Sequence, residues 1–310
     1  MNVARTQYPY TNTIAAQAAT GRFMMKRSTA FVRHAHGLAV AVLCLVSFAA
    51  APRASAAESE AALVPLPSVP DFTRGGGWGV ALGAGIEYEA AYNGSDEYEV
   101  EFEPAVAVQW RLDNQMLFFE GFELGWRGRF ADLWLLQAGL EIDEGLEPDD
   151  SDDGALDGLP ERDSHVVGVL EARRGIGGDW RNWIAVRVLG GESDAGLLGV
   201  LSVGHVFGDG RPDGTGTEIF AFVTFADSTY INNDFGVSEA DSAASGLAPI
   251  DLDGGFRSAS VNLIHRRNLG QRLQLAAAAG YELYSSDIAD SPIARDDFEY
   301  DVELSLVWRF

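Results

Sequence analysis

The sequence has one cysteine, few basic residues and no apolar stretch suited to a bundle of membrane helices. Its 310 residues include 22 Lys and Arg against 46 Asp and Glu, which gives a formal net charge of −24. One cysteine excludes a disulfide scaffold and a cysteine-based zinc cluster. So large a negative charge argues against nucleic acid as a partner. The mean hydropathy of −0.02 is too low for a helical membrane bundle but suits a membrane β-barrel, whose strands are half polar.

The N-terminal part has the features of an export signal. A basic stretch at residues 26–33 is followed by an apolar stretch at residues 38–51 and then by Ala54 and Ala56 in an A-x-A arrangement. This order is typical of a cleaved secretory signal peptide. We predict that residues 1–56 contain the signal and that cleavage follows Ala56.

The predicted mature chain is more acidic than the full sequence. The first 57 residues hold six basic residues and no acid, so the remainder has 16 arginines against 46 acids and a net charge of −30. Residues 1–23 precede the basic stretch with which a signal peptide normally begins. We therefore expect them to be an extension, with translation starting at Met24 or the next methionine. The rest divides into a Pro-rich periplasmic leader, residues 57–74, and a body, residues 75–310.

Within the body, apolar residues recur at every second position. Side chains alternate between the two faces of a strand, so this pattern predicts strands with one apolar and one polar face. The segments are about 10 to 14 residues long, whereas ordinary globular strands have roughly 5 or 6 and membrane-spanning strands need about 9 to 11. Eleven segments are found, at about 77–88, 99–111, 116–126, 134–142, 164–174, 180–190, 197–207, 217–227, 256–268, 271–284 and 298–310.

This pattern predicts an all-β transmembrane antiparallel barrel. Lipid offers no hydrogen-bond partner to the backbone, so an open sheet cannot span a bilayer. Bacterial barrels have an even number of strands. Either a strand is missed between residues 112 and 163, giving twelve, or two segments are one, giving ten; we favour twelve. The alternative is a soluble β-sandwich, whose strands should be shorter.

The connecting segments differ in length as expected for a barrel. Tight turns such as residues 112–114 are predicted to face the periplasm, and longer polar loops such as 143–163, 228–255 and 285–297 to be external. Residues 147–153 are strongly acidic, which suits either a solvated loop or divalent ions that bridge it to lipopolysaccharide.

An acidic row lies on the predicted inner face. Glu99, Glu101 and Glu103 alternate with apolar residues, and Arg111 follows on the same face. Rings of one charge can select ions, so a cation-preferring lumen is one hypothesis. Buried charges need partners, so a lumen filled by Glu–Arg pairs is the other, which we prefer.

Nothing in the sequence predicts a catalytic, cofactor or metal site. His165, His205 and His265 fall in three separate segments, without the spacing of a metal motif. Ser202 and His205 are three positions apart on a predicted strand and so point to opposite faces. No G-x-S-x-G elbow is present. We therefore predict no enzyme, with an outer-membrane hydrolase as the least favoured alternative.

Several short motifs resemble the MipA/OmpV family of Gram-negative outer-membrane proteins. They are Gly83 and Gly85 of a G-x-G; Tyr92, Gly94 and Ser95 of a Y-x-G-S; Phe235, Gly236 and Val237 of an FGVS; Ser245, Gly246 and Leu247 of an SGL; Asp290, Ser291 and Pro292 of a DSPI; and a terminal Trp308-Arg309-Phe310. Ala90 replaces the family's expected proline.

The resemblance implies a noncatalytic barrel in the Gram-negative cell outer membrane. It implies a scaffold that brings a lytic transglycosylase together with a murein synthase. Outer-membrane lipid and lipopolysaccharide would surround the barrel, and Trp308 and Phe310 resemble the signal read by the barrel-assembly machinery. A scaffold is thus the first functional hypothesis, and a small channel for cations or solutes is the alternative.

Overall fold

The structure, a computed structural model, describes residues 76–310 except 121–122, 144, 147, 149–150, 152–153, 163, 193 and 208–214. The predicted signal peptide with Ala54 and Ala56, and all of the predicted leader, lie outside the described residues. The side chain of Glu103 also lies outside them.

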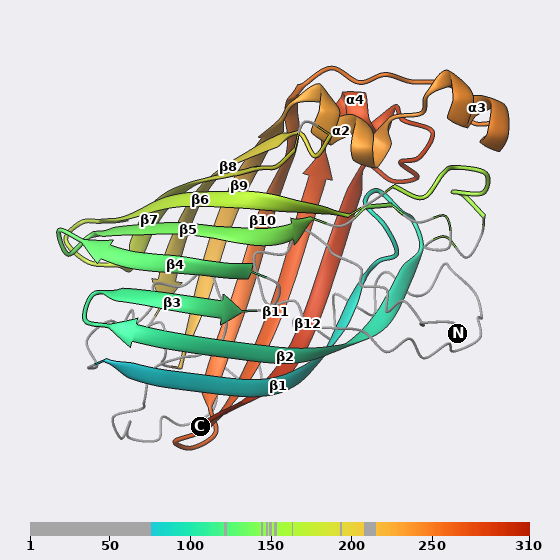
Figure 1. Cartoon of the computed structure of the whole chain (residues 1–310). Helices are drawn as coiled ribbons and strands as arrows, with labels where there is room; N and C mark the ends of the chain where they lie inside the picture. Colours follow the sequence, from blue (N-terminus) through green and yellow to red (C-terminus); the bar gives the residue numbers. More distant parts are fainter. Residues whose placement is uncertain are drawn as a thin grey trace, which may run out of the picture.

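The described residues form twelve strands that close into one antiparallel barrel (Figure 1). Each strand pairs with its neighbours in sequence, and β1 pairs with β12 to seal the cylinder. The strands are β1 (Gly77–Ala90), β2 (Tyr98–Leu112), β3 (Gln115–Glu120), β4 (Glu123–Phe130), β5 (Trp134–Asp143), β6 (His165–Ile176), β7 (Asn182–Gly190), β8 (Leu197–Phe207), β9 (Gly216–Ala226), β10 (Gly255–Asn268), β11 (Leu273–Tyr284) and β12 (Phe298–Arg309).

Alternation along each strand separates an apolar outer wall from a polar interior. On β12, Leu306 and Trp308 are 43% and 44% exposed, whereas Ser305 and Arg309 are buried. A wall of exposed apolar side chains around the whole sheet would be unstable in water and suits a bilayer. The fold predicted from the sequence is therefore confirmed, including the number of strands.

The third predicted segment, residues 116–126, is wrong as a single strand. It contains all of β3 except its first residue, and the start of β4, with Glu120 and Glu123 as cross-strand partners. The hairpin reverses the expected faces of β3: Met116 and Phe118 point inward and are 1% and 2% exposed. Both pack on Leu135 inside the barrel, so an apolar side chain on this strand did not mark the lipid face.

The two ends of the barrel differ. Short turns such as residues 113–114 and 269–272 lie at the same end as the C-terminus, and long segments lie at the other. Three helices lie at the long-loop end (Figure 1): α2 (Ser228–Phe235), α3 (Glu239–Ser245) and α4 (Ser286–Ala289). Bacterial barrels place short turns in the periplasm, so the helices are at the outer end. None of the helices among the described residues has the length and apolar character needed to cross a membrane.

Candidate functional site

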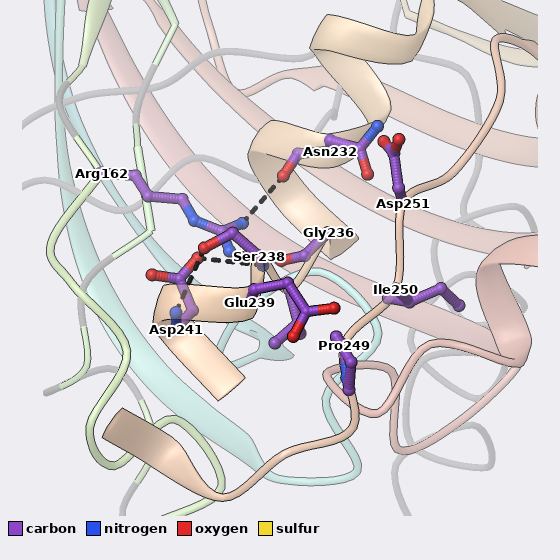
Figure 2. A pocket seen from close by; sticks show the side chains of 10 residues that line it. Arg162, Asn232, Gly236, Ser238, Glu239, Asp241, Pro249, Ile250 and Asp251 are labelled. Carbon is purple, nitrogen blue, oxygen red and sulfur yellow. Dashed lines mark hydrogen bonds between the residues drawn. The ribbon is translucent and has the colours of Figure 1, made fainter. Parts of the chain in front are cut away.

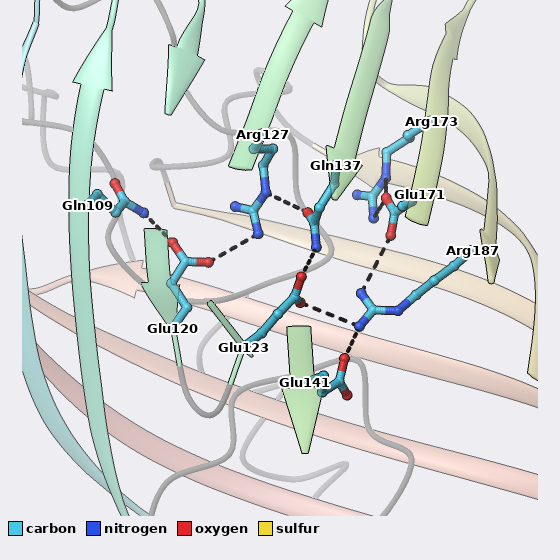
Figure 3. Close-up of polar contacts among 9 residues, drawn as sticks. All are labelled: Gln109, Glu120, Glu123, Arg127, Gln137, Glu141, Glu171, Arg173 and Arg187. Carbon is cyan, nitrogen blue, oxygen red and sulfur yellow. Dashed lines mark hydrogen bonds and ion pairs between the residues drawn. The ribbon is translucent and has the colours of Figure 1, made fainter. Parts of the chain in front are cut away.

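Charged side chains form a connected network on the inner face of β2 to β5 (Figure 3). Arg127 Nη2 lies 3.2 Å from Glu120 Oε2, and its Nε donates to Gln137 Oε1 at 2.6 Å. Gln137 in turn donates to Glu123 Oε1 at 2.7 Å, and Gln109 donates to Glu120. Both carboxylates therefore have donors.

Arg187 of β7 extends the network across two more strands (Figure 3). Its guanidinium bonds Glu141 and lies 3.4 Å from Glu123 Oε2 and 3.8 Å from Glu171 Oε2. Glu171 also accepts from Arg173, with a closest N–O distance of 2.9 Å. These residues come from β4, β5, β6 and β7, so the pairs tie four strands together inside the barrel.

A second interior group lies between β7 and β10. Trp183 Nε1 donates to Glu218 Oε1 at 3.0 Å, and Arg266 Nη2 lies 3.3 Å from Glu218 Oε2. The guanidinium of Arg173 stacks over the Trp183 ring at 4.4 Å, which connects the two groups. Glu218 is 1% exposed, so its charge is held by partners and not by solvent.

Among the charged side chains on the inner face of β11, β12, β1 and β2, carboxylates outnumber arginines. In the register, Glu87 faces Glu303 on one side and Glu101 on the other, and Glu282 faces Glu299. Like charges directly opposite one another are destabilising. This acidic wall therefore favours nearby positive charge. Its members with described side chains are Glu87, Glu89, Glu99, Glu101, Glu282, Glu299, Asp301 and Glu303.

The predicted lumen residues with described side chains lie on the inner face of β2. Glu99 and Glu101 share the inner face of β2 with Gln109, while their neighbours Val100 and Phe102 are 64% and 51% exposed on the outer face. Arg111 lies on the same inner face near the short-turn end and is half-buried. The ion pairs of Arg127 and the other network arginines are made with carboxylates of β3 to β6.

At the outer end, α2 is anchored to the barrel wall by a buried arginine. Arg257 sits where a register shift interrupts β10, and such bulges re-aim a side chain. Its guanidinium lies 3.2 Å from Asp234 of α2 and 3.1 Å from Glu282 of β11. Burial raises the pKa of Asp234 above its ordinary value, and Arg257 opposes that rise.

A second arginine binds the C-terminal end of the same helix. Arg162 donates to the carbonyl oxygens of Asn232 at 3.2 Å and Gly236 at 2.6 Å, and also to that of Asn233. Cations stabilise the negative end of a helix dipole. Burial lowers the pKa of Arg162, although Asp234 and Asp241 counteract this. The loop between β5 and β6 is thereby tied to α2.

Three of the family motifs meet in this outer cap, which we define as the packed loops of the long-loop end. Tyr92 donates its hydroxyl to the Ile293 carbonyl at 3.3 Å, and Ser291 Oγ donates to the Phe235 carbonyl at 2.6 Å. Gly94 adopts φ +80° and accepts from two backbone amides of the β11–β12 loop. Phe235 and Ile293 are fully buried. These motif residues therefore hold the loops to one another.

The remaining motif residues have local roles. Ser245 accepts from the Leu247 amide, and Gly246 ends α3 with φ +79°. Gly83 and Gly85 lie in the β1 wall beside β12, away from the cap. Trp308 and Phe310 are exposed on the outer wall at the short-turn end, where the Phe310 amide donates to the Val80 carbonyl at 2.9 Å. Their role as an assembly signal stays a prediction.

The cap contains a hollow of about 480 Å³ (Figure 2). Its acidic side chains are Glu239, Asp241 and Asp251, and Asp241 is engaged with Ser238 in a capping box at the start of α3. The lining has neither a histidine nor a cysteine. It is lined by Arg162, Asn232, Gly236, Val237, Ser238, Glu239, Asp241, Pro249, Ile250 and Asp251.

A smaller hollow of about 160 Å³ lies under α2, with Asp143, His165, Asp194 and Asp234 in its lining. Within the described part of the chain, no three His, Cys, Asp or Glu residues are grouped closely enough to hold a metal ion. His205 pairs with Asn182 and His265 with Thr217, both at 2.8 Å, on separate strands.

Sequence reasoning missed the residues that fasten the cap. Asp234, Arg162 and Asn93, which donates to Asp234 at 3.3 Å, were not singled out. Asn93 and Asp234 each lie inside or next to a family motif, which was the available signal. Arg257 falls in the predicted strand segment 256–268, but its contact with α2 was not predicted.

Comparison with known proteins places the barrel in a family. The family model described as "MltA-interacting protein MipA" matches residues 82–310. The Escherichia coli (strain K12) protein titled "Putative outer membrane protein YiaT" is 27% identical over 233 residues. The alignment covers 74% of this chain and 91% of that protein.

Solved barrels are more distant. OprB of Pseudomonas putida is 9% identical with a TM-score of 0.40, covering 83% of this chain and 100% of that one. The toluene transporter TbuX of Ralstonia pickettii is 10% identical with a TM-score of 0.39, covering 77% and 90%. Likenesses this weak carry no functional argument. The family match extends across almost the entire barrel. The chain is an outer-membrane β-barrel and belongs to the family described as "MltA-interacting protein MipA".

Proposed function

We propose that this barrel is a closed, noncatalytic scaffold that holds murein-remodelling enzymes at the periplasmic face of the outer membrane. The observation that supports an occluded lumen is the burial of paired polar side chains in the barrel interior. Gln109 of β2, Glu218 of β9 and Gln274 of β11 are 3%, 1% and 0% exposed. In a water-filled pore such side chains would be solvated, as they are in wide porins.

The choice of partner rests on the family. Its description names an interaction with MltA, and the resemblance noted from the sequence implies a lytic transglycosylase and a murein synthase. The periplasmic turns, such as residues 113–114 and 177–181, are the parts of the described barrel within reach of a periplasmic enzyme. Lipopolysaccharide and the barrel-assembly machinery remain proposed partners of the outer wall.

A binding measurement tests the scaffold. The mature protein in nanodiscs should bind a soluble lytic transglycosylase of the MltA type, and replacing turn residues 177–181 by a short Gly-Asn turn should weaken that binding. Replacement of α3 at the opposite end is the matched control and should leave it unchanged. Absence of a complex at micromolar concentrations, or equal binding by both variants, would contradict the proposal.

A cation channel is the second candidate, because the acidic wall on β11, β12, β1 and β2 favours positive charge. Planar-bilayer recording separates the two. Steady, cation-selective conductance would support the channel, and silence would support the closed scaffold.

A further inference from the structure

Arginines on the lipid-facing wall are confined to one end of the barrel. Among the described strands, Arg174 of β6 and Arg267 of β10 share the outer face with exposed neighbours such as Leu170 and Val261, and both lie near the short-turn end. Arg272 is exposed in the adjoining β10–β11 turn. The other described strand arginines point into the barrel, and the outer cap is strongly acidic.

Among the described residues, these guanidinium groups have no carboxylate partner. In the described part of the chain, no Asp or Glu oxygen lies within 4.0 Å of Arg174, Arg267 or Arg272, in contrast to the interior arginines. An arginine at a membrane surface that has no carboxylate partner among the described residues can bind an anionic group of the membrane. Arginine also matches phosphate geometry with its planar fork of donors.

Arg174 is the best-defined of the three. It faces Trp134 directly in the β5–β6 register, and its guanidinium lies 5.2 Å from the centre of the Trp134 ring. Ile184, its partner on β7, is 44% exposed, and Trp134 is 39% exposed. The cation is therefore fixed on an aromatic ring within an apolar outer wall.

The level of this pair matches the phosphate region of a bilayer. Trp78, Trp110 and Trp308 are exposed near the same end, so Trp134 belongs to an aromatic belt. Such belts sit at the membrane–water interface, and arginine side chains extend from there to the headgroups. A soluble protein could reach this face only by displacing lipid, which favours a lipid as the occupant.

We propose that the periplasmic rim of the outer wall binds acidic phospholipids of the inner leaflet, with Arg174 on Trp134 as the principal phosphate contact. Arg267 and Arg272 form a second contact four strands further round the barrel. The barrel is thereby held with its acidic cap outward and its arginines against anionic headgroups.

Native mass spectrometry of the folded, full mature protein tests this inference. The probe is phosphatidylglycerol competed against phosphatidylcholine, and the readout is the ratio of bound lipids. A surface arginine contributes roughly 1 kcal/mol to binding anionic lipid, so Arg174→Gln should lower the preference about fivefold. The triple variant R174Q/R267Q/R272Q should abolish it, and 1 M salt should weaken it in the wild type.

Two further variants test whether lipid binding depends on the arrangement of Arg174 and Trp134 or on positive charge alone. Arg174→Lys should keep most of the preference, and Trp134→Leu should reduce it by a smaller factor than Arg174→Gln. Arg295→Gln removes the same charge at the outer end and should change nothing. Heat-modifiable migration on gels should show that every variant is folded, because Arg174 forms no ion pair with any described residue.

An unchanged lipid ratio in the folded triple variant would overturn the proposal. So would retention of the lipid preference together with lost binding of a soluble periplasmic enzyme, since the arginines would then dock a protein. The scaffold function is tested separately, by binding of the soluble lytic transglycosylase, and does not depend on this result.

Discussion

Asp234 of α2 and Arg257 of β10 form a 3.2 Å ion pair that fastens α2 to the barrel wall. The arginine is fully buried and also lies 5.6 Å from the centre of the Phe235 ring, which belongs to a family motif. One side chain thus joins the strand wall, the helix and the core of the cap. The cap is consequently part of the barrel fold and not an appended loop.

Removing this arginine should open the cap. Arg257→Gln leaves the half-buried Asp234 and the buried Glu282 without this cation, and breaking a buried ion pair costs about 3–5 kcal/mol. We expect the outer loops to become protease-sensitive while the strands stay folded, as followed by limited proteolysis and heat-modifiable migration. Asp234→Asn keeps a polar side chain and leaves Arg257 with Glu282, so it should cost less. Equal protection of all three proteins would refute the anchoring role.

The same pair should make cap stability depend on pH. Burial raises the pKa of Asp234 above 3.8, so the closed cap binds more protons than the open one. This stabilisation is present below 3.8 and is lost as the pH rises through the higher pKa of the closed cap. The opening free energy of α2, from hydrogen exchange, should therefore fall across that window. Asp234→Asn should show a smaller fall, and an identical one would exclude Asp234 as the source.

Two glycines of the cap allow a matched comparison. Gly94 and Gly246 both have positive φ, +80° and +79°. A Cβ on Gly94 would lie 3.2 Å from Ala294 and from the Phe235 ring, whereas a Cβ on Gly246 would meet nothing within 4 Å. Both alanine variants should lower the free energy of cap opening by about 1–2 kcal/mol, because alanine disfavours the left-handed backbone. Gly94→Ala should lower it by about 1–3 kcal/mol more, because its Cβ overpacks the cap.

Urea titration of cap opening, followed by hydrogen exchange in α2, measures both variants. Comparable losses for Gly94→Ala and Gly246→Ala would mean that the close packing of the motifs is not important for the cap.

Single cysteines can test the facing of β3, because the predicted mature chain has none of its own. Phe119 is 40% exposed on the outer wall and Phe118 is 2% exposed inside. A membrane-soluble maleimide should label Phe119→Cys in vesicles and spare Phe118→Cys. Leu124→Cys, at a position 59% exposed on β4, is the positive control. Labelling of Phe118→Cys would restore the single strand expected from the sequence.

The barrel wall was predictable because its determinant is local. Lipid on one side and a polar interior on the other impose the period of two, and β12 shows it over almost all of the predicted span. β3 lacked this contrast: Met116, Leu117, Phe118 and Phe119 are all apolar, since the interior there is packed rather than wet. The hairpin after Glu120 was therefore hidden.

The cap was predictable only in outline. Its contacts join residues far apart in the chain, such as Ser291 with Phe235 and Arg162 with Gly236, and no periodicity encodes them. The motifs marked which loops matter, but they carried no information on which loop contacts which. Likewise the acidic row on β2 was visible, whereas its continuation onto β11, β12 and β1 required the register of a closed barrel.

The interior network offers the sharpest test of a closed lumen. Arg187 contacts Glu123, Glu141 and Glu171, so Arg187→Gln leaves three carboxylates with one donor fewer inside the barrel. We expect a lower midpoint for heat-induced unfolding and, since the freed carboxylates attract water and cations, the appearance of cation-selective conductance in planar bilayers. Arg174→Gln removes the same charge from the outer wall and should do neither. If the wild type already conducts as strongly as the Arg187 variant, the network does not seal the barrel, and the channel candidate takes precedence over the closed scaffold.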